Sequence, residues 1–204
     1  MNQYSTSNKI PKTRRGRETR DKLLDAAEKE FGEQGFHDAA ISGITQRAGV
    51  ALGTFYVYFE SKEEIFRALV SHMGNLTRHW IAERVADSPD RLTAERRGIQ
   101  AFFEFVRRHG NLYQIISEAQ FVAEDAYREY YTAFADAYRE NLERAANDKD
   151  IREGDYEVWA WALIGMSVFL GMRFAAWDDS RSSEEMAATV ADLISTGMLP
   201  GPKK

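Results

Sequence analysis

The stretch ISGITQRAGVALGTFYVYFESKEEIF, residues 41–66, decides the fold, and the pentapeptide FYVYF at its centre is its ambiguous part. By β-propensity alone, residues 55–59 would form a strand with Phe55, Val57 and Phe59 on one side. No partner strand is apparent nearby, and a lone strand leaves backbone groups unpaired on both edges. A short helix pairs those groups internally and places Phe55 and Phe59 one turn apart. We therefore predict a helical turn and a half at FYVYF.

The segments on either side of FYVYF also have helical signals. Apolar residues within 41–48 recur at i, i+3 and i+7, and Gly49 follows where a left-handed residue commonly ends a helix. Ser61 and Glu64 have the spacing of a capping box, which opens a longer helix. Three short helices, the second and third separated by a tight turn and preceded by a basic arm, are the requirements of a helix-turn-helix.

The rest of the chain predicts further helices. Residues 23–31 have one apolar face, and we expect Gly32 and Gly35 to end that helix. Further helical patterns cover residues 93–108, 112–117, 127–147, 156–177 and 183–197. The segment 156–177 is apolar nearly all round, which predicts burial on several sides. Its uninterrupted apolar run, 159–172, is shorter than the roughly 20 residues of a membrane span, so we expect a core helix.

Composition limits the class of protein. The chain has 204 residues, no cysteine and a net charge of −5, so disulfides and thiolate metal sites are excluded. Residues 9–22 hold seven basic and two acidic side chains, whereas residues 71–204 hold 16 basic and 22 acidic ones. A basic tip on an acidic body suits contact with phosphate by the tip alone. The polar start has no apolar signal segment, and we expect a cytoplasmic protein.

Residues 48–66, AGVALGTFYVYFESKEEIF, resemble the signature of the tetracycline-repressor (TetR) family, whose common form is roughly AGVSxGTxYxYFxSKExL. The match extends from about Arg17 to Leu69. The resemblance implies an all-α, homodimeric transcription factor of about nine helices, usually a repressor, that leaves a pseudo-palindromic operator when a small molecule binds. It also implies three parts: a basic flexible arm (1–16), a helix-turn-helix DNA-binding domain (17–64), and a helical ligand-binding and dimerisation domain (65–204).

The family pattern assigns DNA contacts by position. Residues 51–58 would be the recognition helix and supply contacts to base edges, while Tyr56, Tyr58 and Lys62 would bind phosphates. The basic arm would follow the backbone or the adjacent minor groove. The implied DNA-binding residues are Arg14, Arg15, Arg17, Ser42, Leu52, Gly53, Thr54, Tyr56, Val57, Tyr58 and Lys62.

Two positions depart from the family pattern. Ala39 and Ala40 stand where Thr or Ser usually caps the second helix and contacts phosphate, so we expect Asp38 to provide the cap and one phosphate contact to be lost. Ala51 replaces the usual Ser cap of the recognition helix.

The body of the chain contains more aromatic surface than a helix bundle requires, which indicates a pocket for an apolar ligand, although core packing is expected for at least half of these residues. A small effector, largely apolar and with an acyl-type acidic end as one option, fits this composition. The expected ligand-binding residues are Phe102, Phe105, Tyr113, Glu118, Phe121, Tyr127, Tyr131, Phe134, Phe169, Arg173 and Trp177.

Arg173 lies within the apolar run WALIGMSVFLGMRFAAW, so its guanidinium must be paired or reach water. Two roles are open: an internal ion pair with a carboxylate such as Glu118, or an anchor for an anionic ligand. The last two helices resemble the pair that dimerises relatives, and Val190 and Ile194 are the expected interface residues.

Two other functional classes remain open: a helical-bundle enzyme with an appended helix-turn-helix, and an interaction module that has lost DNA binding. The sequence has no GxSxG elbow, phosphate loop or HExxH motif, and no histidine three residues after a glutamate. His72 and His79 share a helix face without a third ligand. We therefore expect no catalytic residues, no metal and no cofactor.

Overall fold

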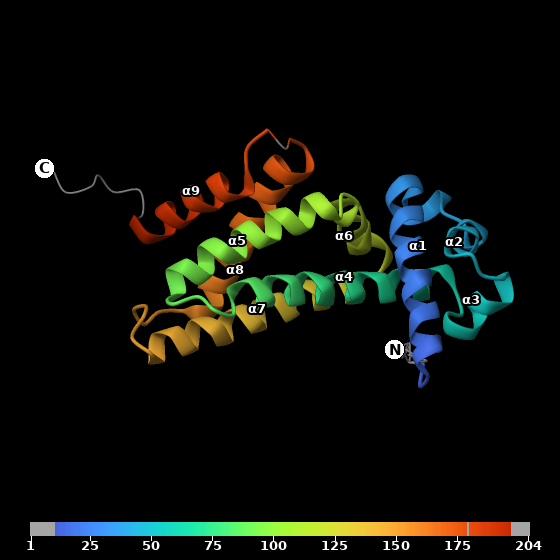
Figure 1. The fold of residues 1–204 in the computed structure, drawn as a ribbon, viewed down its shortest axis with the longest axis horizontal. Helices are drawn as coiled ribbons and strands as arrows, with labels where there is room; N and C mark the ends of the chain where they lie inside the picture. Colours follow the sequence, from blue (N-terminus) through green and yellow to red (C-terminus); the bar gives the residue numbers. More distant parts are fainter. Residues whose placement is uncertain (1–10, 179, 197–204) are drawn as a thin grey trace, which may run out of the picture. The chain divides into compact units, whose positions relative to one another are not determined.

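The computed structural model describes residues 11–178 and 180–196, which contain nine α-helices, one π-helical turn and no strand (Figure 1). This confirms the all-α prediction. The elements are α1 (Arg14–Asp38), α2 (Ile41–Ala48), α3 (Leu52–Tyr58), α4 (Lys62–Val85), α5 (Arg91–Arg108), α6 (Leu112–Val122), α7 (Glu124–Asn147), α8 (Tyr156–Gly171), the π-turn η1 (Met172–Ala176) and α9 (Ser183–Thr196). The sequence pattern of the last helix ran to Gly197, which lies outside the described residues.

The chain divides into two compact units. The first unit contains the described residues up to 72 together with 114–127, and the second contains 73–113 together with 128–196. Helices α4, α6 and α7 each contribute residues to both units.

The first four residues of FYVYF, 55–58, are helical, as predicted. Helix α3 ends at Tyr58, and Phe59 follows it in an extended conformation. Phe55 and Phe59 are both buried, so the two rings one turn apart anchor this short helix in the core of the first unit. Helix α2 ends at Gly49, whose φ of 67° and ψ of 36° are the left-handed values expected there.

Helix α1 is longer than predicted. It begins at Arg14, inside the stretch expected to be an arm, where the hydroxyl of Thr13 accepts a hydrogen bond from the backbone N–H of Gly16 (3.1 Å). The prediction that Gly32 ends the helix is wrong, because the chain is interrupted only at Gly35 (φ 73°, ψ 165°). Packing explains the continuation: Phe36, beyond the break, packs against Phe31 and Phe66.

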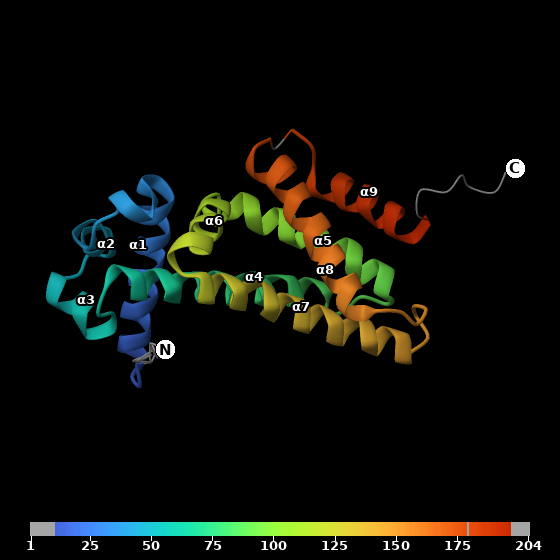
Figure 2. The same cartoon turned by 180° about the vertical axis from the view of Figure 1, so that it is seen from behind.

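The second unit is a bundle around α5. Helix α5 contacts α8, η1 and α9, and it lies beside α4 and α7 in both ribbon views (Figures 1 and 2). The indole N–H of Trp80 in α4 donates to the carbonyl of Ala101 in α5 at 2.9 Å. Along α4, Ile65, Leu69 and Met73 are fully buried, whereas Trp80 is only partly covered.

The prediction that residues 156–177 are buried on several sides is wrong. Val158, Trp161, Phe169 and Trp177 have 45–69% of their surface exposed. An apolar composition predicts that a helix will be packed against another surface, but it does not identify that surface. Within one chain, α8 packs against α5 and leaves other apolar residues exposed. The continuous helix Tyr156–Ala176 also has the length and composition of a membrane span, a test that helices of soluble proteins pass as well.

Candidate functional site

Helix α3 has two opposite faces. Phe55 on one face is completely buried, whereas Leu52, Tyr56 and Val57 on the other are 51%, 49% and 60% exposed. An apolar side chain that stays in water forgoes the stabilisation that burial would give, about 25 cal/mol for each Å² of apolar surface. A short helix that buries one side and holds apolar and phenolic groups outward is suited to insertion into a groove.

The packing within this chain does not explain why position 53 is a glycine. A Cβ atom built at Gly53 would meet no heavy atom within 4 Å, and its φ is not positive. Glycine in a helix costs roughly 0.5–1 kcal/mol relative to alanine. The residue therefore weakens α3 without serving its packing, as expected where another molecule's backbone must approach closely.

Neither α2 nor α3 has a side-chain cap. Ala40 and Ala51 occupy the two N-cap positions, and neither can accept a hydrogen bond through its side chain. The expectation that Asp38 caps α2 is wrong, because Asp38 is the last residue of α1. The first backbone N–H groups of both helices are thus left to solvent or to an external acceptor.

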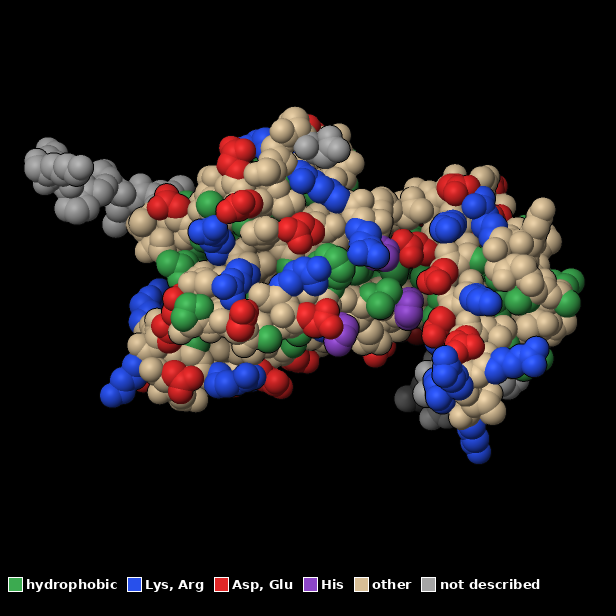
Figure 3. Space-filling model, viewed as in Figure 1, with side chains coloured by type: hydrophobic (Ala, Val, Ile, Leu, Met, Phe, Trp, Pro, Cys, Tyr) green, Lys and Arg blue, Asp and Glu red, His purple; other side chains and the backbone are tan. Residues whose placement is uncertain are grey.

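The basic residues expected at DNA already have internal partners in several cases. Arg14 pairs with Glu18 at 2.8 Å, and the guanidinium of Arg17 donates to the carbonyl of Lys12 at 3.2 Å. Arg15 and Ser42 are exposed. In Figure 3, basic side chains gather over the first turns of α1.

Lys62 has a structural role that the motif did not predict. Its ammonium donates to the carbonyls of His37 (3.0 Å) and Ala39 (2.9 Å) and lies 4.7 Å from the centre of the Phe36 ring. A cation at the carbonyl end of a helix is favourable because the last carbonyls carry partial negative charge. Lys62 therefore fixes the end of α1, and any phosphate must share its remaining donor.

A charge network centred on Arg47 fastens α2 to α1. Arg47 donates to Glu30 at 2.7 Å and to Glu33 at 3.1 Å, and Glu30 is buried. The hydrogen bonds to Glu33 and Glu30 raise the pKa of Arg47. A Cβ atom at Gly43 would lie 2.1 Å from the Glu30 carboxylate, so any larger residue would displace that carboxylate.

Glu118, expected in the ligand site, instead binds the break in α1. Its carboxylate accepts a hydrogen bond from the backbone N–H of Phe36 at 2.7 Å. This N–H follows Gly35, where the helix is interrupted and the donor has no intrahelical carbonyl. Phe121 and Tyr127 belong to the same unit as Glu118, and Phe121 is 85% exposed.

The second unit contains a cavity of about 400 Å³ between α4, α5, α7 and α8. Its volume lies in the usual range of small-molecule pockets. Three of the expected ligand residues line it: Phe102, Tyr131 and Phe134. The other lining residues are Arg78, Ile81, Ala82, Val85, Arg91, Ala94, Glu95, Gly98, Ile99, Tyr130, Ala137, Tyr138, Asn141, Ile164, Ser167 and Val168.

The remaining aromatic residues expected at the ligand lie elsewhere. Phe105 is buried against Trp80 and His109. The hydroxyl of Tyr113 donates to the carbonyl of Val168 at 2.5 Å, and burial raises the pKa of this phenol. Phe169 and Trp177 are each 69% exposed.

Arg173 does not form the pair with Glu118 that was named for one of its two open roles. Its side chain is 49% exposed and pairs with Asp178 at 3.1 Å instead of Glu118. The pKa of Asp178 falls to about 2, first because of its hydrogen bonds from Ser180 and then because of Arg173. Arg173 lies in η1, where its guanidinium is also 4.9 Å from the centre of the Phe174 ring.

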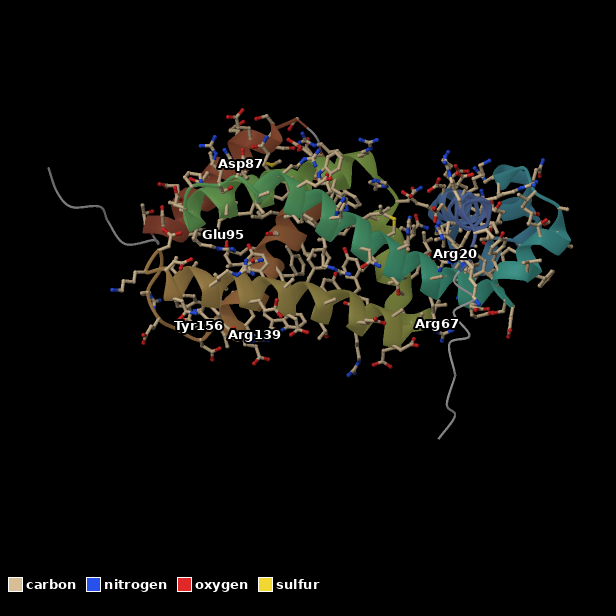
Figure 4. All side chains as sticks on the ribbon, turned by 60° about the horizontal axis from the view of Figure 1, so that its bottom comes forward. Arg20, Arg67, Asp87, Glu95, Arg139 and Tyr156 are labelled. Atoms are coloured by element: carbon tan, nitrogen blue, oxygen red, sulfur yellow. The ribbon has the colours of Figure 1, made fainter. Side chains whose placement is uncertain are left out.

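Sequence reasoning missed a buried charged cluster in the cavity wall. Glu95, only 3% exposed, accepts hydrogen bonds from Arg91 and from the hydroxyl of Tyr138, and Figure 4 shows it between α5 and α7. Burial, followed by the charge of Glu95, raises the pKa of Tyr138 well above its usual value. A signal was available: Arg91, Glu95, Ile99 and Phe102 follow one another at i, i+4, i+8 and i+11, one face of α5.

Comparisons with known proteins agree with this architecture. Residues 23–69 match the model of the bacterial regulatory proteins of the tetR family. The HTH-type transcriptional regulator YdgC of Bacillus subtilis (strain 168) is 31% identical over 191 residues, which cover 91% of this chain and 95% of that protein.

Solved structures have the same fold. The fatty acid degradation regulator FadR from Bacillus halodurans matches with a TM-score of 0.78 and 20% identity, covering 93% of this chain and 98% of the other. The regulator FadR from Bacillus subtilis, solved in complex with stearoyl-CoA, matches with a TM-score of 0.74 and 21% identity, covering 88% and 99%.

Proposed function

Since the chain belongs to the TetR family of bacterial transcriptional regulators, we propose that it represses genes from a pseudo-palindromic operator, which it binds as a homodimer in the cytoplasm. A small, largely apolar effector enters the cavity of the second unit and releases the operator. The first unit, with residues 17–64 at its centre, binds DNA. The remainder of the chain, from residue 65, binds the effector and the partner subunit.

The observation that supports DNA binding most directly is the outward face of α3. Leu52, Tyr56 and Val57 keep 49–60% of their surface exposed, and Gly53 beside them leaves room for a close approach. Major-groove binding by a short recognition helix requires such side chains at its exposed face, with apolar groups against base edges and hydroxyls at phosphates. The uncapped start of α2 offers backbone N–H donors to the phosphates of the DNA.

The exposed apolar residues of α8 and α9 support a dimer. Trp161 and Phe169 of α8 and Leu193 of α9 are 45%, 69% and 43% exposed. Val190, expected at the interface, is buried within its own chain, and Ile194 is partly covered. Leu193 is therefore the better interface residue of α9. Two-fold pairing of this surface would cover it and would place two copies of α3 against successive half-sites.

The cavity supports an effector with a long apolar body. Most of its wall is aliphatic or aromatic, and a few polar groups on α4, α5 and α7 are positioned to fix one end of the ligand. The stearoyl-CoA complex of the B. subtilis FadR shows that a protein of this fold binds an acyl compound. We infer an acyl-type effector here.

Helix α6 is suited to link binding with release. Its residue Tyr113 donates to Val168, which lines the cavity, and its residue Glu118 accepts from Phe36 behind the α1 break. A shift of α6 that accompanied effector binding would change the support of α1. The operator and the effector would then each favour one of two conformations.

Binding to DNA that flanks the protein's own gene tests the function. We expect Tyr56→Phe to weaken binding to specific and unrelated DNA about equally, because a phosphate contact carries no sequence information. Tyr156→Phe, on α8, is the matched control. If Lys62 binds phosphate, Lys62→Ala lowers the slope of log affinity against log salt by about 0.9. Wild-type affinity in both Tyr56→Phe and Lys62→Ala would contradict the assigned surface.

Light scattering tests the dimer. Trp161→Glu and Leu193→Glu each place a charge in an apolar contact, so both variants should become monomers and lose specific operator binding. Glu184→Gln, an exposed change on α9, should leave the dimer intact. Dimers of wild-type stability in both glutamate variants would refute the interface.

A further inference from the structure

The charged residues of the cavity wall differ in how well they are neutralised. Two guanidinium groups, Arg78 and Arg91, and one carboxylate, Glu95, line the cavity within the described part of the chain. The wall therefore carries a net charge of +1, and the location of that charge determines which ligand it favours.

The Arg91 end of the cavity is already neutral. Arg91 and Glu95 form an ion pair one turn apart on α5, and their side chains are only 14% and 3% exposed. Tyr138 donates its hydroxyl to the same carboxylate. An anion bound at this end would face Glu95 across a region of low dielectric constant, which is unfavourable. The end suits an uncharged group.

Arg78 carries the uncompensated charge. Its guanidinium donates to the neutral side-chain amide of Asn75 at 2.6 Å and lies 5.3 Å from the centre of the Phe134 ring. Among residues 11–178 and 180–196, no carboxylate lies within ion-pair distance of it. Asn75 and Phe134 hold the group in place without cancelling its charge, the arrangement expected of an anchor for an external anion.

We infer that Arg78 binds the carboxylate of the effector, so that the cavity takes a free carboxylic acid with an apolar chain in preference to its neutral ester. The inference rests on the proposed function, since it identifies the class of effector for the same cavity. The apolar chain of the ligand lies against the aliphatic and aromatic wall, to which Ile81 and Phe134 contribute. A thioester lacks the carboxylate charge and leaves Arg78 without its partner.

Calorimetric titration of the full chain with decanoate, methyl decanoate, decylammonium and decanoyl-CoA tests the inference. Wild-type protein should bind decanoate about tenfold to a hundredfold more tightly than methyl decanoate, the range for a charge-assisted hydrogen bond. Arg78→Met should remove that preference and leave methyl decanoate affinity unchanged. Arg78→Lys, which keeps the charge but loses the planar guanidinium with its paired N–H donors, should retain part of the preference for decanoate.

The control is Arg139→Met, an arginine of α7 outside the cavity wall that pairs with Glu143. It should bind all four probes as the wild type does, and thermal melts should show every variant folded. Equal binding of decanoate and methyl decanoate, unaltered decanoate binding in Arg78→Met, or a preference for decanoyl-CoA would overturn the role of Arg78 while leaving an effector cavity in place. Failure of every probe to bind, with operator binding intact, would overturn the effector part of the proposed function as well.

Discussion

The two compact units contrast in how their sequences relate to their binding surfaces. In the first unit a continuous motif, residues 48–66, contains most of the proposed DNA-binding surface. It also contains the core residues Phe55, in α3, and Phe59, directly after that helix. In the second unit the cavity wall is assembled from four helices that lie up to 90 residues apart. A regular polymer such as DNA demands one repeated geometry, whereas a small ligand can be enclosed by many combinations of side chains.

The units also differ in where they hold their charges. The first unit uses charged groups as fasteners: Arg47 between Glu30 and Glu33, and Lys62 on the carbonyls at the end of α1. The second unit buries a charged pair, Arg91 and Glu95, inside its binding cavity. We therefore expect buried-charge substitutions to be most costly in the second unit and backbone substitutions to be most costly in the first.

The largest expected effect is that of Glu95→Ala. Removing the carboxylate leaves Arg91 buried without a partner, and breaking a buried pair in this way costs about 3–5 kcal/mol of unfolding free energy. Urea denaturation measures the loss. Asp87→Ala, which breaks the exposed pair with Arg97, is the control and should cost less than about 1 kcal/mol. The double change Glu95→Ala, Arg91→Met should recover much of the loss, and if it does not, the buried pair is not the cause.

A second comparison separates the two positive-φ glycines of the first unit. Gly35 has φ 73° and ψ 165°, a region that is essentially restricted to glycine, so Gly35→Asn should cost about 1–3 kcal/mol. Gly49 has left-handed helical values, which asparagine tolerates, and no neighbour lies within 4 Å of its added Cβ. Gly49→Asn should therefore be nearly neutral in the same denaturation assay. Equal costs at both positions would show that backbone strain does not set the difference.

Gly53→Ala should have opposite effects on folding and on DNA binding. The change should stabilise the fold by about 0.5–1 kcal/mol, because alanine favours a helix and the new methyl group meets open space. It should weaken operator binding, because the methyl group would lie on the side of α3 that we propose contacts DNA. Denaturation and gel shifts measure the two effects. An alanine variant that binds the operator normally would mean that Gly53 is not a site of close approach.

The smallest expected effect concerns pH and His72. Burial disfavours the protonated ring and lowers its pKa, although the charges of Asp21 and Asp25 act in the opposite direction. The unfolded chain then takes up the proton at higher pH than the folded chain, so stability falls as pH drops below about 6.5, the ordinary value. Between pH 7.5 and 5.5 the wild type should lose more stability than His72→Gln. His79→Gln, at an exposed position, should behave as the wild type.

The sequence predicted the first unit better than the second for a physical reason. The capping pair Ser61 and Glu64, the helix end at Gly49 and the burial of Phe55 depend on neighbours within a few residues, and all are confirmed. The break at Gly35 with its partner Glu118 depends on a contact between residues 82 positions apart, which local patterns do not contain.

In the second unit, the sequence showed that α8 is apolar. It did not show whether the same chain or another molecule packs against that helix. Phe169 and Trp177 appear equally suited to a core, a pocket or an interface when only composition is considered. Tyr131 and Phe134, two of the aromatic residues expected at the ligand, do line the cavity. Arg78 and Glu95 were missed because the charged candidates considered were Arg173 and Glu118, and local patterns do not reveal which helix faces meet around a cavity.

The close contact between Gly43 and Glu30 has a consequence for the history of this gene. A side chain at position 43 requires the Glu30 carboxylate to move, because the new Cβ would otherwise lie 2.1 Å from one of its oxygens. If that carboxylate moves, or if a shorter residue replaces Glu30, Arg47 loses one of its two partners. Substitutions at these three positions are therefore coupled, and descendants of this sequence should tend to change them together.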